Sequence, residues 1–537
     1  MQEQAFISAV EAWRHALGFA HVLTEPAALQ SYADNAGGLT RTLRGVLRPG
    51  NTDDVVAAVR IANEFRIPLH PISLGKNWGM GSRLPVHADA VVVDLARMNR
   101  IRSIDPVQRV AVVEPGVTQG RLYDELKARG LRLRLNVTGS AVDTSLVGNA
   151  LDRGVGYLAS RVDEISGLEV VLGSGRLIRT GFGHFSGARM THVYPHGIGP
   201  DLNGLFFQSN FGIVTAAGMA LMPAPQKQTV MIARLADRTR LGEFIAALAG
   251  LRDQGSMPTV AHVANRNRSE IAMAPLLYEQ IRKYMPGDDA ALKRKAEQML
   301  KDAGFGPWSA VGAIPGTAGQ VRDARRQIRR RLRGLAQVMF LDDFLVQAAK
   351  LLVRPLRFIP YVRNKEALLL AMEPFFRLAG GVPTSAALKS VYWPLNEWPR
   401  TADEDPDQSP CGLLFTLPIL PTTASEVQAA VECIERVFAR YGFTPYITLN
   451  LVNGQALETV INMAFDKRQP DRVAAAHACN EELTAEFIRQ GYVPYRVGIQ
   501  SMAQVVHADD PFWQTVRDLK KALDPNQIIS PGRYNLV

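Results

Sequence analysis

A short apolar segment leads directly into a glycine-rich loop at residues 71–86, PISLGKNWGMGSRLPV. Gly75, Gly79 and Gly81 allow positive φ angles and let a ligand approach the backbone, so the N–H groups of this loop can surround a pyrophosphate. The loop is not a P-loop, because Gly-Lys-Ser/Thr does not occur in it, and it lacks the strand-loop-helix frame of the GxGxxG dinucleotide fingerprint. The pattern therefore predicts either a phosphate cradle of another kind or a plain turn.

The segments around this loop predict an α+β protein of two domains, a division for which a chain of 537 residues is long enough. Short β-branched strands follow one another up to about residue 225, at 67–73, 90–95, 109–116, 167–175 and 212–223. From about 226 to 489, longer segments with helical apolar spacing alternate with strands, as in 291–304, 412–420, 425–442 and 447–453. A helix that ends at Asp524-Pro525, followed by a Ser-Pro-Gly turn, indicates that residues 490–537 return to the first domain.

Composition narrows the classes of function. Lys and Arg outnumber Asp and Glu by only 61 to 51, which favours small anionic ligands and argues against nucleic-acid binding. The three cysteines have neither a disulfide pattern nor metal-ligand spacing, so no metal site is expected and a reducing compartment is indicated. Because the N-terminus lacks the order of a signal peptide and no apolar run reaches the roughly 18 residues of a membrane span, we expect a soluble, cytoplasmic enzyme.

One segment, residues 322–362, joins an arginine cluster to a nearly continuous apolar run that Pro355 interrupts. A peripheral contact with a membrane surface, or a contact between two copies of the chain in a homodimer, would suit such a segment. The interpretation that we favour is a long connection that folds back onto its own domain and leaves its arginines in water.

The glycine loop stands at the head of a longer pattern. It is followed by VVVDLARMN (91–99), VEPGVTQGRLYDEL (113–126), TSLVGNALDRGVGY (144–157), YPHGIGPDLNGLFFQSNFGIVT (194–215) and DPNQIISPG (524–532). In order and spacing these segments resemble the FAD-binding domain of the vanillyl-alcohol oxidase and p-cresol methylhydroxylase family. The resemblance implies a two-domain α+β fold of the p-cresol methylhydroxylase type. In it, residues 1–225, completed by 490–537, bind FAD, and residues 226–489 form a substrate-binding cap over the isoalloxazine ring.

The resemblance also assigns individual residues to FAD. They lie in the glycine loop, in the segment after position 138, near the strand at 212 and in the C-terminal turn. The assigned residues are Pro71, Ser73, Leu74, Gly75, Lys76, Asn77, Trp78, Gly79, Gly81, Ser82, Gly139, Ser140, Thr144, Ser145, Gly148, Asn149, Gly204, Gln208, Gly212, Ile213 and Arg533, with Asn210 near the adenine or the flavin.

In VPYRVG (493–498), Tyr495 and Arg496 match the family's Tyr-Arg pair that holds a substrate phenol as its phenolate. An arginine that keeps its proton lowers the pKa of a phenol, and a neighbouring tyrosine supplies a hydrogen bond to the same oxygen. The resemblance implies that a hydride then leaves the α-carbon of the para substituent for the flavin, which generates a quinone methide. Tyr157 matches a further catalytic position, and the residues assigned to the substrate pocket are Met80, Leu413, Leu449 and Val460.

The sequence departs from the family at three positions. Met80 replaces a second tyrosine of the phenolate clamp, and a thioether cannot donate a hydrogen bond. Ser140 replaces an aspartate near the flavin, so any activation of water needs another group, for which Asp143 is one candidate. Leu413 occupies the position of the covalent flavin link, and residues 409–419 contain no His or Tyr. We therefore expect FAD to be held without a covalent bond.

The leading interpretation is oxidation of a para-substituted phenol, or a phenol-like compound, at its benzylic carbon. Gly139, a small residue expected beside the flavin, favours oxygen as the electron acceptor, and a cytochrome partner stays open. One alternative is FAD-dependent oxidation of a non-phenolic alcohol, a carbonyl compound or a natural-product intermediate. Another is a flavin-binding protein without turnover.

Overall fold

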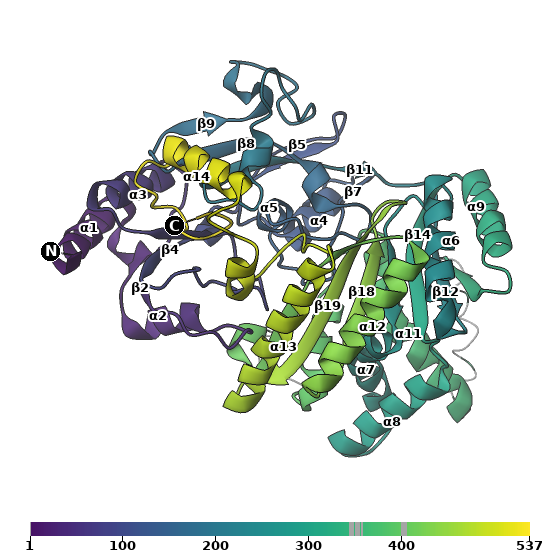
Figure 1. Cartoon of the computed structure of the whole chain (residues 1–537). Helices are drawn as coiled ribbons and strands as arrows, with labels where there is room; N and C mark the ends of the chain where they lie inside the picture. Colours follow the sequence, from purple (N-terminus) through teal and green to yellow (C-terminus); the bar gives the residue numbers. More distant parts are fainter. Residues whose placement is uncertain (1, 343–347, 349–354, 356–357, 399–404, 537) are drawn as a thin grey trace.

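The computed structural model describes residues 2–342, 348, 355, 358–398 and 405–536 (Figure 1). Its N-terminal part contains a four-stranded sheet in the order β1 (Val22–Leu23), β2 (Leu43–Leu47), β4 (Ala90–Asp94) and β3 (Leu69–Ile72). β2, β4 and β3 are parallel, and β1 pairs antiparallel with β2. The helices of this part are α1 (Gln2–Leu17), α2 (Pro26–Ala33) and α3 (Thr52–Phe65). The Asn51 side chain caps α3 by accepting the Asp54 N–H, and Val55 and Val59 bury its apolar face.

A second, antiparallel sheet follows, in the order β5 (Ile101–Asp105), β6 (Val110–Val113), β10 (Gly212–Ala220), β8 (Ile165–Leu172) and β9 (Leu177–Arg179). All positions of the internal strand β8 are buried, which suits its mainly apolar sequence, and the carboxylate of Glu169 is paired with Arg102 and Arg179. Two short helices, α4 (Gln119–Ala128) and α5 (Leu146–Leu151), and the small pair β7 (Leu133–Arg134) and β11 (Met222–Pro223) complete this region.

The C-terminal segment lies against the first sheet. After α14 (Pro511–Leu523) the chain passes beside β3, where the Leu69 N–H donates to the Ile528 carbonyl at 2.7 Å. The Ser530 N–H in turn donates to the Leu69 carbonyl at 2.7 Å. These bonds add a short parallel bridge at the edge of the sheet and bring the end of the chain to the loop that follows β3.

An eight-stranded antiparallel sheet forms the second half of the molecule. Its order is β15 (Ala336–Leu341), β12 (Lys227–Leu235), β14 (Trp308–Gly316), β13 (Ala261–Asn265), β18 (Tyr446–Leu451), β19 (Ala456–Asp466) and β16 (Cys411–Thr416), with β17 (Ile419–Pro421) also paired to β19. The associated helices are α6 (Leu241–Asp253), α7 (Arg266–Arg282), α8 (Asp289–Asp302), α9 (Ala318–Arg331), α11 (Pro360–Ala379), α12 (Ala424–Arg440) and α13 (Pro470–Arg489).

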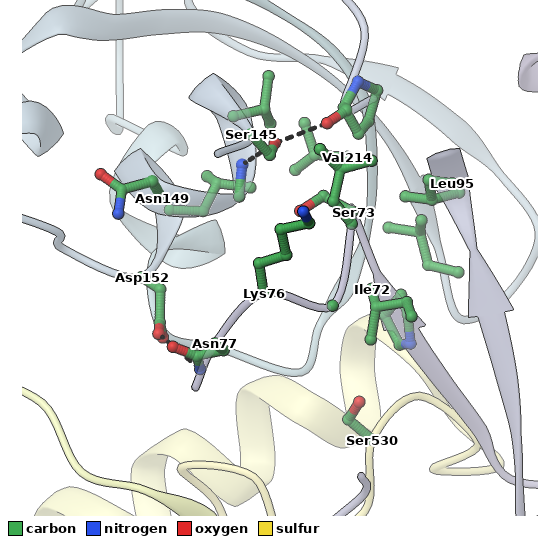
Figure 2. A pocket seen from close by; sticks show the side chains of 18 of the residues that line it. Ile72, Ser73, Lys76, Asn77, Leu95, Ser145, Asn149, Asp152, Val214 and Ser530 are labelled. Carbon is green, nitrogen blue, oxygen red and sulfur yellow. Dashed lines mark hydrogen bonds between the residues drawn. The ribbon is translucent and has the colours of Figure 1, made fainter. Parts of the chain in front are cut away.

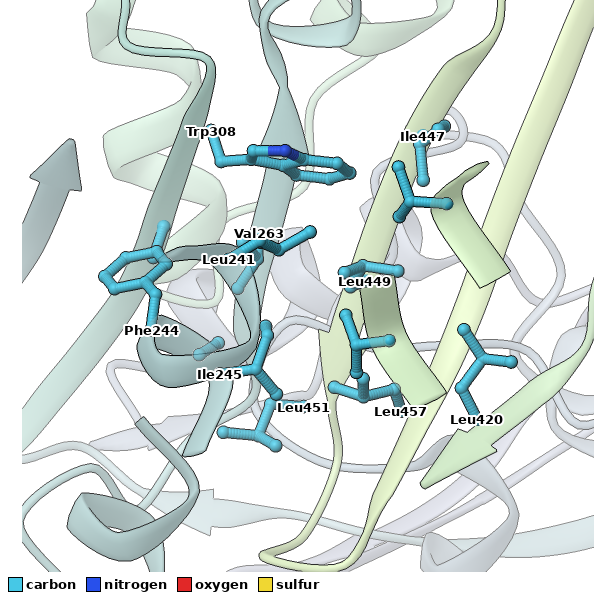
Figure 3. Packing of buried hydrophobic residues seen from close by; sticks show 14 of the residues in the cluster. Leu241, Phe244, Ile245, Val263, Trp308, Leu420, Ile447, Leu449, Leu451 and Leu457 are labelled. Atoms are coloured by element: carbon cyan, nitrogen blue, oxygen red, sulfur yellow. The ribbon is translucent and has the colours of Figure 1, made fainter. Parts of the chain in front are cut away.

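The two faces of this sheet have different roles. On one face, Val263, Ile447 and Leu449 pack with Leu241 and Phe244 of α6 in an apolar cluster (Figure 3). Because successive side chains of a strand point to opposite faces, the residues between them project from the other side. That second face carries polar side chains and borders a cavity described below.

Up to residue 342, the arginine-rich segment forms a helix and a strand, and the long connection that the sequence suggested is not found there. Residues 322–331 belong to α9, whose apolar side buries Val321, Ala324 and Ile328, and β15 is the edge strand of the eight-stranded sheet. Arg325 is paired with Asp342 at 2.9 Å. The apolar half of the segment lies outside the described residues between 343 and 357, apart from 348 and 355, so a membrane contact there stays a prediction. None of the helices in the described parts of the chain is long and apolar enough to cross a bilayer.

Candidate active site

A cavity of about 200 Å³ lies between the loop after β3, the start of α5 and the C-terminal turn. Figure 2 shows Ser73 and Lys76 from the loop, Ser145 and Asn149 from α5, and Ser530 from the C-terminal segment around it. Most residues predicted to bind FAD line this cavity, namely Pro71, Ser73, Leu74, Gly75, Lys76, Asn77, Ser82, Thr144, Ser145, Gly148, Asn149, Gln208, Gly212, Ile213 and Arg533.

The backbone of this cavity suits a pyrophosphate. Gly75 has φ +66°, and a Cβ at Gly148 would collide with the Ser73 hydroxyl, so both positions require glycine. Ser145 Oγ donates to the Pro115 carbonyl at 2.6 Å and accepts the Gly148 N–H at 3.0 Å, which fixes the start of α5. The buried Asn149 Oδ1 finds no partner in the described part of the chain. Glycine backbone N–H groups, serine hydroxyls and the cations Lys76 and Arg533 suit a pyrophosphate, and Asn149 Oδ1 can accept from a hydroxyl or N–H of the cofactor, so the residues present fit FAD.

Seven residues assigned to FAD do not line this cavity: Trp78, Gly139 and Ser140 line an adjoining cavity, and Gly79, Gly81, Gly204 and Asn210 line neither. A Cβ at Gly79 would stand 2.8 Å from the Phe415 ring, and one at Gly81 2.9 Å from Ile499, so these glycines allow close packing of the loop. Gly204 lines neither this cavity nor the adjoining one described next. Apart from its chain neighbours, no heavy atom of the described residues lies within 4 Å of a Cβ built there. Asp143, the candidate replacement for the missing aspartate, forms an ion pair with Lys76 and is largely exposed.

A second cavity, of about 270 Å³, lies between the glycine loop and the polar face of the eight-stranded sheet. It shares Lys76, Asn77, Thr144, Asn149 and Arg496 with the first cavity, so the two adjoin. The predicted residues that line it are Trp78, Met80, Gly139, Ser140, Tyr157, Leu413, Val460, Tyr495 and Arg496.

The prediction for Leu449 is wrong. Leu449 is fully buried in the apolar cluster on the helix-covered face of the sheet (Figure 3). Its neighbours Thr448 and Asn450 line the cavity instead, because strand residues alternate between faces. An offset of one residue is therefore enough to exchange a pocket residue for a core residue.

Arg496 is held by the carboxylate of Asp152, a residue that no motif in the sequence indicated. Its Nε donates to Asp152 Oδ2 at 2.7 Å, and its Nη2 contacts the same oxygen at 2.6 Å and also Asn77 Oδ1. The other Asp152 oxygen accepts from Arg533 at 2.8 Å. Burial lowers the pKa of Arg496, but Asp152 more than offsets this effect and the net pKa is raised. No acceptor among the residues that the structure describes takes the two N–H groups of Nη1, which stay available to a ligand.

Tyr495 lies beside this cluster. Its N–H donates to the Leu417 carbonyl at 3.1 Å, and its own carbonyl accepts from Gln208 of the first cavity at 2.9 Å. Burial, with the nearby Glu458 carboxyl, raises the pKa of Tyr495 well above its ordinary value. Its hydroxyl therefore keeps its proton at neutral pH and can donate a hydrogen bond to an anion.

Two further cavity residues come from β13 and the start of α7. His262 lies against Tyr157, with a distance of 4.2 Å between ring centroids, and its Nδ1 is 2.6 Å from Asn450 Oδ1. Burial lowers the pKa of His262 to about 4, so the ring is neutral. Arg268 also lines the cavity and donates from Nη1 to Ser390 Oγ at 3.1 Å. The sequence signal for this pair is faint, namely polar residues within and just after the short apolar strand AHVAN.

The Glu458 carboxyl is expected to make the stability of the fold depend on pH. Its carboxyl is largely buried, and burial, with a contribution from Asp163, raises its pKa from 4.5 to about 7. Between these pH values the folded chain keeps a proton that the unfolded chain has released, so this group lowers the free energy of unfolding as pH rises through that window. Compared with wild type, Glu458→Gln is expected to be more stable at pH 8 by about 1–3 kcal/mol and to differ less at pH 5. Urea unfolding of both proteins at the two pH values measures this, and a gap that does not grow with pH would contradict it.

Comparison with known proteins shows which family and which relatives this chain is similar to. Residues 43–181 match the family described as FAD binding domain. The chain is 34% identical to 1'-carboxy-chondrochloren decarboxylase of Chondromyces crocatus, over 100% of this chain and 98% of that protein. It is 30% identical to the flavoprotein subunit of 4-cresol dehydrogenase (hydroxylating) of Pseudomonas putida, over 99% of this chain and 96% of that protein.

Solved structures agree with these relatives. A structure of p-cresol methylhydroxylase with substrate bound matches with a TM-score of 0.83 at 28% identity, over 99% of this chain and 97% of that one. The isoeugenol complex of 4-ethylphenol oxidase from Gulosibacter chungangensis matches with a TM-score of 0.84 at 26% identity, over the same shares. Fold and site together define a FAD-dependent oxidoreductase with an α+β fold of the p-cresol methylhydroxylase type. The chain belongs to the vanillyl-alcohol oxidase and p-cresol methylhydroxylase family.

Proposed function

We propose that this flavoprotein removes a hydride from the benzylic carbon of a para-substituted phenol or a phenol-like compound. The observation that carries the proposal is the position of Tyr495 and Arg496 on the second cavity, with Arg496 also lining the first. Residues 1–225 with 490–537 would hold FAD, and residues 226–489 would enclose the substrate. When bound, FAD would accept the hydride, with oxygen as the proposed final acceptor.

The residues of the chain would prepare the phenol for this step. Arg496 keeps its charge and has Nη1 free, while Asp152 and Asn77 fix the plane of its guanidinium. Tyr495, still protonated, would donate to the same oxygen. A phenolate pushes electron density into its ring, which favours departure of the hydride and formation of a quinone methide. Met80 lies on the cavity and supplies no hydrogen bond, so the charge would rest mainly on Arg496.

The test is anaerobic mixing of the FAD-loaded protein with 4-propylphenol and, separately, with its methyl ether. The two compounds have the same para substituent, but the ether cannot form a phenolate. The proposal expects loss of the oxidised flavin absorbance with the phenol alone. Equal reduction by the ether would remove the role of the phenolate, and reduction by neither would favour the second candidate.

The second candidate is FAD-dependent oxidation of a non-phenolic alcohol, a carbonyl compound or a natural-product intermediate. Two observations favour it: Met80 and Ser140 stand where the resemblance expects a tyrosine and an aspartate, and the relative at 34% identity is named for a decarboxylation of a carboxylated compound. Because another relative is named as a flavoprotein subunit, a separate electron-accepting protein such as a cytochrome is the alternative to oxygen.

The mode of FAD binding gives another prediction. Leu413 of β16 lines the cavity at the position where the resemblance places the covalent link, and its alkyl side chain cannot form a bond to the flavin. Acid or heat is therefore expected to release intact FAD from the purified protein. Flavin fluorescence that stays with the protein band after denaturing electrophoresis would contradict this prediction.

A further inference from the structure

Arg268 places a guanidinium at the end of the substrate cavity away from Tyr495. It lies in the first turn of α7, where its backbone N–H donates to Oδ1 of Asn265, the residue that caps the helix, at 2.9 Å. Its side chain lines the cavity and is anchored by one hydrogen bond, from Nη1 to Ser390 Oγ. The helix backbone and the serine therefore fix the root and one branch of the side chain, and the rest of the guanidinium can meet a ligand.

Arg268 differs from the other arginine of this cavity in having no counter-ion. Arg496 is paired with Asp152, but no carboxylate within the described ranges of the chain pairs with Arg268. The ionisable groups that act on it most are the phenols of Tyr157 and Tyr446, whose pKa values burial raises, so both are neutral at neutral pH. Arg268 is partly withdrawn from water, which is costly for a cation without a partner, and a bound anion would lower that cost.

The sheet sets the separation of the two ends of the cavity. Arg268 follows β13, whereas Tyr495 is bonded to Leu417, which directly follows β16. β18 and β19 lie between these strands, so β13 and β16 are about 14 Å apart at the usual strand spacing. The residues that line the cavity between them are uncharged and of both kinds: β18 and β19 contribute Thr448, Asn450, Asn462 and Val460, and Leu388 and Val391 add apolar surface beside Ser390. The cavity therefore has one guanidinium on its β13 side and another beside Tyr495, with the uncharged side chains of β18 and β19 between them.

We propose that Arg268 binds a carboxylate at the far end of the para side chain, so that the substrate class is a phenol whose side chain carries a carboxylate. This inference rests on the proposed function, because it assumes that the phenol oxygen lies at Tyr495 and Arg496. One guanidinium balances one negative charge, and its planar fork matches the two oxygens of a carboxylate. The uncharged section between the two arginines, with Leu388, Val391 and Val460 in its lining, accepts the aromatic ring and the alkyl chain.

Three probes of similar length test the inference: 3-(4-hydroxyphenyl)propanoate, neutral 4-propylphenol and the cation 4-(2-aminoethyl)phenol. Binding to the holoenzyme with chemically reduced flavin is measured by calorimetry, so that turnover does not enter, and anaerobic flavin reduction is measured separately. Wild type is expected to bind the acid at least about 10-fold more tightly than the alkylphenol, and the amine most weakly. This order needs no substitution, and equal binding of acid and alkylphenol would overturn the inference.

Substitutions test whether the preference for the acid depends on Arg268. Arg268→Met is expected to lower the ratio of acid to alkylphenol affinity by roughly 10–100-fold, and Arg268→Lys to retain part of the preference. Arg266→Met removes an exposed arginine two residues earlier and should leave the ratio unchanged. An unchanged ratio in Arg268→Met would overturn the assignment. If that variant fails to hold FAD, the Lys variant and the wild-type order decide.

The outcomes separate this inference from the proposed function. If 4-propylphenol reduces the flavin but the acid has no advantage that depends on Arg268, the inference fails alone. If the acid binds through Arg268 but no phenol reduces the flavin, the anion site stands and the phenol oxidation fails.

Discussion

Replacing Arg496 with alanine is expected to slow anaerobic flavin reduction by a 4-alkylphenol roughly 10²–10³-fold, while FAD stays bound. Arg496 lines the cavity with Nε and Nη2 bound by Asp152, and we expect its Nη1 to stabilise negative charge on the phenol oxygen. A preorganised charged donor in a site shielded from water has a large effect on rate, because it needs no reorganisation as charge develops. Stopped-flow measurement of the reduction rate gives the result directly.

Two variants sharpen this experiment. Arg496→Lys is expected to recover little, because a single ammonium cannot bind Asp152 and the phenol oxygen in the geometry of a planar fork. Arg489→Ala, which removes an exposed arginine of α13, should reduce flavin at the wild-type rate. A reduction rate for Arg496→Ala within about threefold of wild type would exclude the phenolate mechanism and leave the non-phenolic candidate.

Replacing Lys520 with methionine is expected to destabilise the fold by about 3–5 kcal/mol. The Lys520 side chain is 1% exposed, and its Nζ lies 2.6 Å from Asp524 Oδ2. It also donates to the Ile529 carbonyl at 2.7 Å and to the carbonyl of Asn210. Without the ammonium, a fully buried carboxylate loses its counter-ion and two carbonyls lose a donor, so desolvation of the remaining charge is less well compensated.

The consequence should reach the cofactor site, because this ion pair holds the C-terminal turn beside β3. Asp524 accepts the Ile528 and Ile529 N–H groups at 3.1 and 2.8 Å, just before the cavity residues Ser530 and Arg533. Urea unfolding followed by protein and flavin fluorescence would show a lower midpoint and earlier release of FAD. Lys521→Met is the matched control, since the Lys521 side chain is 54% exposed and should change stability by less than about 1 kcal/mol. Equal midpoints for the two variants would refute the role of Lys520.

The electrostatic part of the site was only partly predictable. From the sequence, Tyr495 and Arg496 were the only donors expected to stabilise a phenolate, and the cavity adds Arg268 and neutral His262. Arg496 binds Asp152, which stands 344 positions earlier in the chain. A carboxylate in such a segment is an ordinary polar residue until the fold brings it to a guanidinium, so no local pattern indicates the pairing.

The amino-acid sequence by itself determined the elements that depend on local chemistry. Glycines that permit positive φ and close backbone approach marked the loop after β3, and short β-branched segments marked strands. Only the tertiary structure decided which strand face meets the cavity, which excluded Leu449 and admitted Asn450, and which distant charges are paired. The physical reason is that backbone preferences act between neighbours in the chain, whereas burial and ion pairing depend on side chains that only folding brings within a few ångströms.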